Sequence, residues 1–524
     1  MARSLLVRHG SVLSLLTLAS RVLGLFREMV KASFLGTTAL SDAFSVAFLI
    51  PNLFRRLFAE GSIAVAFIPT FKAYLIEGDK EAIREFLSCI WTFLTFFVTL
   101  AVIAGMAFTP LIMPLFKMEQ ELFDETVFLT RLMFPFLAFI SLAALFQGIL
   151  NSLRIFTPSG LAPILLNLVT IGAAFGLSRF TANPARAMAI GILAGGFLEA
   201  AVQFPFILKK GWAFCFVALP RALANPGVRK VLRLIVPTII GMAAYQVNDL
   251  VSTALARRVG EGVASSLQYS LRLQELMLGV FAVSIGTVLL PDLAEYAKSS
   301  QWDQYRAKLT GALRVIALIT VPATFFLLVQ GEYLIRLFFQ IRSFGEESVR
   351  LTLNAFTFHI IGLFFIALNR VLAPAFYACH DSASPSLAGV ISFAANSVLA
   401  LALSAPLKGA GIALSLSAAS GINTALLFFF LTKNPHAAVG KMVRSGLLYT
   451  LKIAVFALLA VLPVYALKPA LAALFGGRTS RMLVYGLPLG ISALVYGAAG
   501  FLLLALAQDP YARRIIRFFK KKKP

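Results

Sequence analysis

Charged side chains are scarce in this sequence. Asp, Glu, Lys and Arg make up 13% of the 524 residues, whereas a typical soluble domain has about 25%. Apolar stretches of about 20 residues, the length of a transmembrane helix, recur along the chain. The alternating pattern of a membrane β-barrel strand is not seen, because segments such as Phe93–Met106 and Ile453–Leu462 are apolar on nearly every face. The composition therefore predicts an all-α polytopic membrane protein.

The chain also has few groups suited to metal binding or covalent chemistry. Its three cysteines, Cys89, Cys215 and Cys379, are far apart, and its four histidines are scattered. Neither pattern matches a metal site or a disulfide framework. A phosphate-binding loop of the Gly-Lys-Ser/Thr type is also missing. We therefore expect a protein that is not an enzyme and that uses neither a metal nor a cofactor.

Positive charge is in large excess, with a formal net charge of +24. The basic residues gather in short loops and in the C-terminal segment Arg513–Lys523, as residues that encode membrane topology do. This distribution favours a phospholipid bilayer as the partner and excludes nucleic acid. If the N-terminus is cytoplasmic, most loop cations fall on the cytoplasmic side. We therefore predict a multi-pass protein of the bacterial inner membrane with both termini cytoplasmic. Arg21 interrupts the first apolar run, so no cleavable signal peptide is expected.

Apolar windows between charged breaks predict about 14 transmembrane helices. Their approximate spans are 10–32, 40–72, 84–113, 124–150, 157–178, 186–208, 231–256, 264–294, 307–330, 348–378, 385–404, 409–432, 445–467 and 482–507.

A weak internal repeat divides these helices. The segment Ala66–Tyr74 resembles Val288–Tyr296, and Phe156-Thr-Pro158 resembles Ala383-Ser-Pro385. Both pairs have nearly the same separation, which spans six helices and so keeps the same orientation. We predict two pseudo-symmetric six-helix lobes, residues 1–210 and 211–435, followed by 436–524 with two further helices and the basic tail. Parallel repeats of this kind are typical of transporters whose substrate path runs between the halves.

Several of the predicted helices contain charges at bilayer depth, each of which costs about 2.5–3.5 kcal/mol to insert. These charges are Arg21, Arg27, Glu28, Asp42, Arg55, Arg56, Glu60, Asp249, Arg272, Glu275 and Arg370. Helical spacing allows Arg21 to pair with Glu28 and Arg56 with Glu60. Arginine remains in surplus, and its planar donor fork suits phosphate. The pattern favours an anion site and leaves a structural ion-pair network as the alternative.

Several motifs make a family resemblance specific. They are Ser20-Arg-Val-Leu-Gly-Leu-Phe-Arg27, Ser41-Asp-Ala-Phe44, Pro51-Asn-Leu-Phe-Arg-Arg-Leu-Phe-Ala-Glu-Gly61, Gly286-Thr-Val-Leu-Leu-Pro291, Ala373-Pro-Ala-Phe-Tyr377 and Leu407-Lys-Gly-Ala-Gly-Ile-Ala-Leu-Ser415. Together they resemble the MurJ (MviN) family of lipid II flippases. The resemblance covers residues 10–435, and the last two helices share only its hydropathy.

The resemblance implies a fold like that of the multidrug (MATE) and polysaccharide-lipid exporters, with an extra helix pair that forms a groove for a polyprenyl tail. It implies as substrate an undecaprenyl-diphosphate-linked disaccharide-pentapeptide (lipid II), moved to the outer leaflet by alternating access for peptidoglycan biosynthesis. It also implies contacts with the cell-wall synthesis machinery. The family's essential arginines correspond to Arg21, Arg27, Arg55 and Arg272, and its essential aspartate corresponds to Asp42. We assign Glu28, Asp42, Arg56, Glu60 and Glu275 to cavity ion pairs or gating.

A sodium site of some family members has no clear counterpart. Its helix-7 acid aligns with Ser252, while Asp249 lies three residues earlier on nearly the same face, and Asn396 is a further polar candidate. Coupling to Na+ or to the membrane potential therefore stays open. An O-antigen-lipid or multidrug exporter of the same superfamily is the alternative function. A cationic-drug exporter should have an acidic cavity, and the surplus of arginine argues against it. A membrane glycosyltransferase needs a catalytic acid and a large external loop, and no loop here is long enough. A structural scaffold would not need charges at bilayer depth.

Overall fold

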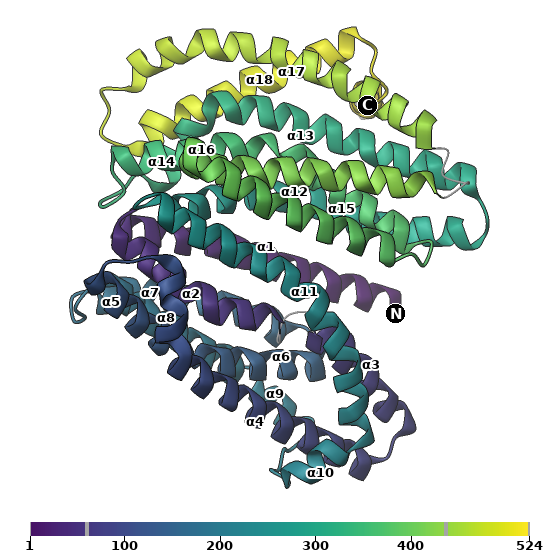
Figure 1. Cartoon of the computed structure of the whole chain (residues 1–524). Helices are drawn as coiled ribbons and strands as arrows, with labels where there is room; N and C mark the ends of the chain where they lie inside the picture. Colours follow the sequence, from purple (N-terminus) through teal and green to yellow (C-terminus); the bar gives the residue numbers. More distant parts are fainter. Residues whose placement is uncertain (1, 58–61, 434–438, 522–524) are drawn as a thin grey trace. The chain divides into compact units, whose positions relative to one another are not determined.

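The structure of the chain is a computed structural model that describes residues 2–57, 62–433 and 439–521. Side-chain surroundings are described for these ranges except at 2–14, 62–65, 236–245, 280–288, 439, 515–516 and 518–521. Every regular element in the described ranges is a helix (Figure 1). The predicted all-α class is therefore confirmed.

Long apolar helices dominate the described part of the chain. Eight of them are long and apolar enough to cross a membrane, and a ninth candidate is the pair Glu346–Ile361 and Leu363–Tyr377, bent by 43° at its break. Within the described residues each of the 14 predicted spans overlaps one or more helices, and residues 58–61 of the span 40–72 lie outside them. The number of 14 membrane crossings stays a prediction.

The chain forms two compact units. The N-terminal unit is Met1–Ser265 with Ile341–Phe344, and the C-terminal unit is Ser266–Gln340 with Gly345–Pro524. The boundary between these units lies after the lobe boundary of 210 that the repeat predicts. Gly227, near the start of helix α11, shows the reason: a Cβ atom there would lie 2.5 Å from the ring of Phe86 on helix α4. The first part of α11 therefore packs within the N-terminal unit, and the repeat-based lobes stay a prediction.

The N-terminal unit is an assembly of long and short helices. They are α1 (Ala2–Leu35), α2 (Ala39–Arg55), α3 (Ser62–Glu77), α4 (Lys80–Ile112), the 3-10 turn η2 (Met113–Phe116), α5 (Gln120–Met133), α6 (Phe136–Ser152), α7 (Thr157–Leu177), α8 (Pro184–Ala201), α9 (Phe204–Leu208), α10 (Leu219–Ala224) and α11 (Pro226–Val259).

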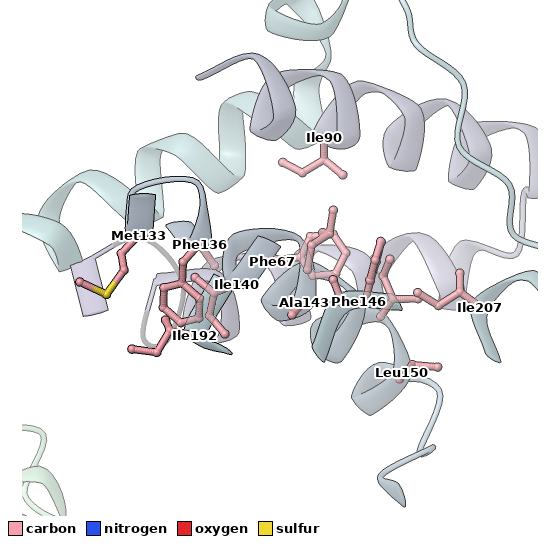
Figure 2. Packing of buried hydrophobic residues seen from close by; sticks show 14 of the residues in the cluster. Phe67, Ile90, Met133, Phe136, Ile140, Ala143, Phe146, Leu150, Ile192 and Ile207 are labelled. Carbon is pink, nitrogen blue, oxygen red and sulfur yellow. The ribbon is translucent and has the colours of Figure 1, made fainter. Parts of the chain in front are cut away.

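Aromatic residues fill much of the core of this unit. The rings of Phe67 and Phe86 stack with their centroids 5.8 Å apart, and Trp91 stacks on Phe146 at 5.9 Å. Figure 2 shows side chains of this buried cluster, among them Phe67, Phe136 and Phe146. The cluster brings together residues from α3, α4, α6 and α8 and also includes Leu35 of α1 and Phe44 of α2, so the two charged helices pack on the same core.

Small residues allow helices α7 and α8 to approach closely. A Cβ atom at Gly191 would lie 2.9 Å from the Cα atom of Thr170, and one at Gly195 would lie 3.1 Å from the Cα atom of Leu166. The two glycines are four residues apart on α8, which is the spacing that membrane helices use for close packing.

The C-terminal unit contains the remaining helices. They are α12 (Val263–Lys298), whose first residues belong to the N-terminal unit, α13 (Trp302–Phe339), α14 (Glu346–Ile361), α15 (Leu363–Tyr377), α16 (Ala383–Thr432), α17 (Val439–Phe475), the π-helical turn η3 (Met482–Gly486), α18 (Leu487–Leu506) and α19 (Pro510–Lys521).

Two features of these helices bear on the predicted spans. Helix α16 contains a break at Lys408, where φ is 52° and ψ is −134°, two residues after Pro406. This break falls between the predicted spans 385–404 and 409–432. Helix α19 occupies part of the basic tail, beyond the last predicted span 482–507.

Candidate functional site

Helix α1 carries the first group of charges. Arg21 is exposed, whereas Glu28 is 9% exposed and lies 2.9 Å from its neighbour Arg27, measured from Oε1 to Nη2. One turn further, Lys31 is 4% exposed and donates a hydrogen bond of 2.8 Å from Nζ to the Ser45 hydroxyl of α2. Sequence reasoning missed Lys31, although it belongs to the same charged stretch of α1.

Asp42, in the first turn of α2, is fully buried. One carboxylate oxygen, Oδ2, accepts hydrogen bonds from Arg257 Nη1 at 2.6 Å and from the Gly262 amide at 2.8 Å. The other, Oδ1, accepts one from the Ser265 amide at 2.8 Å. We call these four residues the Asp42 latch. The latch joins the start of α2 to the end of α11 and to the first turn of α12.

Arg257 is the cationic member of the latch, and sequence reasoning missed it. The predicted seventh span ended at residue 256, so Arg257 fell just outside the helices whose charges were considered. In the structure it lies in the last turn of α11, and its side chain is 8% exposed. Burial of an ion pair at this depth requires close geometry, because desolvation of both charges opposes their attraction. Asp42 was assigned to ion pairing or gating, and the structure identifies Arg257 as its cationic partner.

The end of α2 holds a second group of charges. Arg55 donates from Nε to the Asn52 side-chain oxygen at 2.9 Å. Arg56 lies 3.8 Å from Asp249 of α11, with both side chains about one third exposed. The predicted partner of Arg56, Glu60, lies outside the described residues. Asp249 therefore brings α11 to the charged end of α2.

The residues predicted for a cation site belong to different units. Asp249 and the half-buried Ser252 belong to the N-terminal unit, whereas Asn396 is buried in α16 of the C-terminal unit. The guanidinium of Arg56 beside Asp249 opposes a further cation at that carboxylate. Among the described residues, no cluster of three or more His, Cys, Asp or Glu side chains could hold a metal ion.

In the C-terminal unit, Arg272 pairs with Glu275 one turn along α12, with 2.9 Å between Nη1 and Oε2. Both side chains are about half exposed, at 41% and 53%. On the same helix, the Ser270 hydroxyl lies 2.6 Å from Nδ1 of His359, which is buried in α14. Gln274 donates to the backbone carbonyl of His359. These two contacts fix α12 against α14 and so position the helix that presents Arg272.

The charges of the N-terminal site do not balance. The carboxylates of Glu28, Asp42 and Asp249 each contact an arginine. The cations described above on the same helices, α1, α2 and α11, number six and are Arg21, Lys31, Arg27, Arg55, Arg56 and Arg257. Among the described residues of this group the surplus is three positive charges, and an anion with several oxygens would neutralise it. The groups can bind such a ligand electrostatically but offer no nucleophile or paired acid and base for covalent chemistry.

Comparison with protein families gives one match that covers most of the chain. The model of the family described as "Lipid II flippase MurJ" matches residues 31–484. The chain is 44% identical over 522 residues to the "Probable lipid II flippase MurJ" of Treponema pallidum (strain Nichols), and the match covers 98% of each protein. It is 33% identical to the "Lipid II flippase MurJ" of Burkholderia cenocepacia, over 80% of this chain and 82% of that protein.

Solved structures share the fold. A structure described as "Lipid II flippase MurJ, inward closed conformation" matches with a TM-score of 0.78 and 24% identity, over 95% of this chain and 99% of that one. An inward-facing multidrug resistance transporter of the MATE family matches with a TM-score of 0.70 and 12% identity, over 80% of this chain and 96% of that one. The predicted MATE-like fold is thus confirmed, and the extent of the sequence matches shows that this multi-pass membrane protein belongs to the MurJ family of lipid II flippases.

Proposed function

We propose that this chain is a lipid II flippase that moves undecaprenyl-diphosphate-linked disaccharide-pentapeptide from the cytoplasmic to the periplasmic leaflet of the inner membrane. Family membership and the 44% identity to a relative of that name support the proposal. The observation that carries it is the surplus of three positive charges among the charged side chains described above on α1, α2 and α11. A diphosphate supplies negative oxygens of the kind that arginine binds best.

In the proposed mechanism, Arg27 and Arg272 bind oxygens of the diphosphate, while Arg21 and Arg55 add positive potential. Alternating access then exposes the headgroup on the other side, and the apolar tail remains in lipid because transfer into a polar cavity costs about 25 cal/mol for each Å² of apolar surface. No bond of the substrate is broken. Coupling to Na+ or to the membrane potential, cytoplasmic placement of both termini and contact with the cell-wall synthesis machinery belong to the same proposal.

The test combines single substitutions with an assay for lipid II at the outer surface of cells that depend on this chain. Arg27→Ala and Arg272→Ala should abolish complementation of a flippase-depleted strain. Arg27→Lys keeps the charge but loses the donor fork, so it should retain only part of the activity. Arg350→Ala is the matched control for Arg272→Ala, because Arg350 is an exposed arginine of the same unit that pairs with a glutamate three residues away, as Arg272 does.

Wild-type translocation by both alanine variants, at wild-type protein levels in the membrane, would reject the arginine site. The alternative of multidrug export rests on the shared MATE fold. It predicts that cells expressing the chain resist cationic drugs without any change in lipid II exposure. The positive surplus opposes this alternative, because a cavity for cations requires negative charge.

A further inference from the structure

A basic cavity in the C-terminal unit lies far along the chain from Arg21, Arg27 and Arg55, and its lining on α12 begins at Leu289, 17 residues after Arg272. Its volume is about 1350 Å³, and its walls come from the end of α12, the first turns of α13 and α17, and the start of α19. Figure 1 shows that α13, α17 and α18 run together in this unit. All lining residues belong to the C-terminal unit.

The lining of this cavity is strongly positive. It includes six cations, Arg306, Lys308, Arg314, Lys441, Lys452 and Arg514. Asp509, which is fully buried, is the acidic lining residue and pairs with Lys452 at 3.0 Å. Asp303 pairs with Arg306, and Asp292 pairs with Lys308 at 2.5 Å. After these three pairs, a surplus of three positive charges remains among the described residues of the cavity.

Neutral hydrogen-bonding groups stand beside these cations. Arg314 donates from Nη2 to the Ser445 hydroxyl, and its guanidinium lies 5.7 Å from the ring centroid of Tyr449. The Tyr511 hydroxyl donates to the Gly311 carbonyl at 3.3 Å. The Nε–H of Arg314 is buried without an acceptor in the described part of the chain. A bound anion with several oxygens would meet donors of both kinds, charged and neutral.

An apolar slot continues from this cavity along the same helices. Its volume is about 240 Å³, and it lies between Leu318 of α13, Ile453 and Ala457 of α17, and Gly497 and Phe501 of α18. Lys452 lines the cavity and the next residue, Ile453, lines the slot. The slot reaches Ala460, eight residues beyond Lys452, which is about 12 Å along a helix. One site therefore has a cationic end and an apolar end.

The outer face of α17 continues the apolar surface. Leu447, Leu451, Val455, Leu458 and Leu462 recur at helical spacing and are each at least half exposed. Such a face suits contact with acyl chains. The lining cation Lys441 precedes this run on α17, whereas Lys452 lies within it and directly before Ile453 of the slot.

We propose that the cavity and slot bind an anionic glycerophospholipid of the bilayer, with the phosphate among Arg314, Lys441 and Arg514 and part of an acyl chain in the slot. An amphiphile is the ligand that matches both ends, whereas a free anion would leave the slot unused. The basic loops and tail predict that this end of the helices is cytoplasmic, and the cytoplasmic leaflet is where anionic lipids create a negative surface potential. The lipid would act as a fixed component that holds α13, α17 and α18 together.

The test measures lipid retention by the purified full-length protein with native mass spectrometry. The probe is phosphatidylglycerol, and phosphatidylcholine is the neutral comparison. The double variant Lys441→Gln and Arg514→Gln removes two exposed charges and should weaken phosphatidylglycerol binding about fivefold for each charge. Arg444→Gln is the matched control, because Arg444 is exposed at the same end of α17 but does not line the cavity.

A second pair of variants tests the slot. Gly497→Leu adds a side chain where a Cβ atom meets nothing within 4 Å, so the new side chain would fill the slot without a clash at its base. Gly490→Leu is its control, because Gly490 also has open space around it and lies on the same helix outside the slot. Weaker retention of phosphatidylglycerol by Gly497→Leu alone is the expected result.

Three outcomes would overturn the proposal. The first is unchanged preference for phosphatidylglycerol in the charge variant, and the second is full displacement of the lipid by inorganic phosphate at equal concentration. The third is displacement by a polyprenyl diphosphate at lower concentration, which would make the cavity a substrate site. Lipid II translocation is measured on the same variants, so that a loss of phospholipid binding can be distinguished from a loss of flippase activity.

Discussion

Removal of Arg257 should destabilise the protein through the Asp42 latch. The side chains of the pair are 8% and 0% exposed, and their atoms are 2.6 Å apart. Arg257→Ala leaves the Asp42 carboxylate buried with only its two backbone amides as donors, and loss of one partner of a buried pair costs about 3–5 kcal/mol. Asp42→Ala removes the charge but also leaves the amides of Gly262 and Ser265 without their acceptor, so its cost should be at least as large.

The free energy of unfolding can be measured by denaturant titration in detergent micelles, with the reactivity of the buried Cys89 thiol as the probe. The double variant should lose at least about 2 kcal/mol less than the sum of the single losses, because both substitutions remove one interaction. Arg258→Ala is the control, since this neighbouring arginine is exposed and should change stability by less than about 0.5 kcal/mol. A cost below about 1 kcal/mol for Arg257→Ala, or additive losses, would refute the latch as a stabilising contact.

Three further predictions concern packing, ion pairing and backbone strain. Gly195→Leu should destabilise by at least about 1–3 kcal/mol, measured in the same titration, because its Cβ atom would lie 3.1 Å from the Cα atom of Leu166. Glu125→Gln should cost about 1.5–3 kcal/mol, because Glu125 is 15% exposed and accepts a 2.6 Å bond from Arg186, and a charge-reversed double variant should recover part of the loss. Lys408→Gly should raise the free energy of unfolding by about 1 kcal/mol, because φ at this break is 52° and glycine adopts it without strain. A lower denaturant midpoint for this variant would show that the lysine side chain contributes more stability than the strain costs.

Helix positions were largely predictable from the sequence, because apolar runs separated by charge mark membrane helices directly. The charged position Lys408 separates the predicted spans 385–404 and 409–432, and the break in α16 lies at that residue. The break between α5 and α6 at Phe134–Pro135 was not predicted, because the flanking residues are apolar on both sides and hydropathy remains high across it. The extent of α19 was not predicted because its basic residues were interpreted as a topology signal, although tyrosine, isoleucine and phenylalanine lie between them in the helix.

The candidate site was predictable in its residue types but not in its pairings. Charge at bilayer depth identified Arg27, Glu28 and Asp42. The partner of Asp42 lies 215 residues away in the sequence, and no local spacing rule relates the two positions. Helical spacing paired Arg21 with Glu28, whereas the structure places Arg27 beside Glu28, because adjacent side chains of this length can fold back onto one another.

The latch also constrains how α2 can move during transport. If α2 separates from the end of α11 in any state of the cycle, Asp42 must find another cation or reach water. At about 3–5 kcal/mol for the broken pair, the separated state without compensation would be populated at about 1% or less. A transporter that uses this separation must therefore offset the cost within the cycle. Neutralisation of the three surplus positive charges by a diphosphate provides one source of that free energy, since it changes the electrostatic environment of the same helices that hold Asp42 and Arg257.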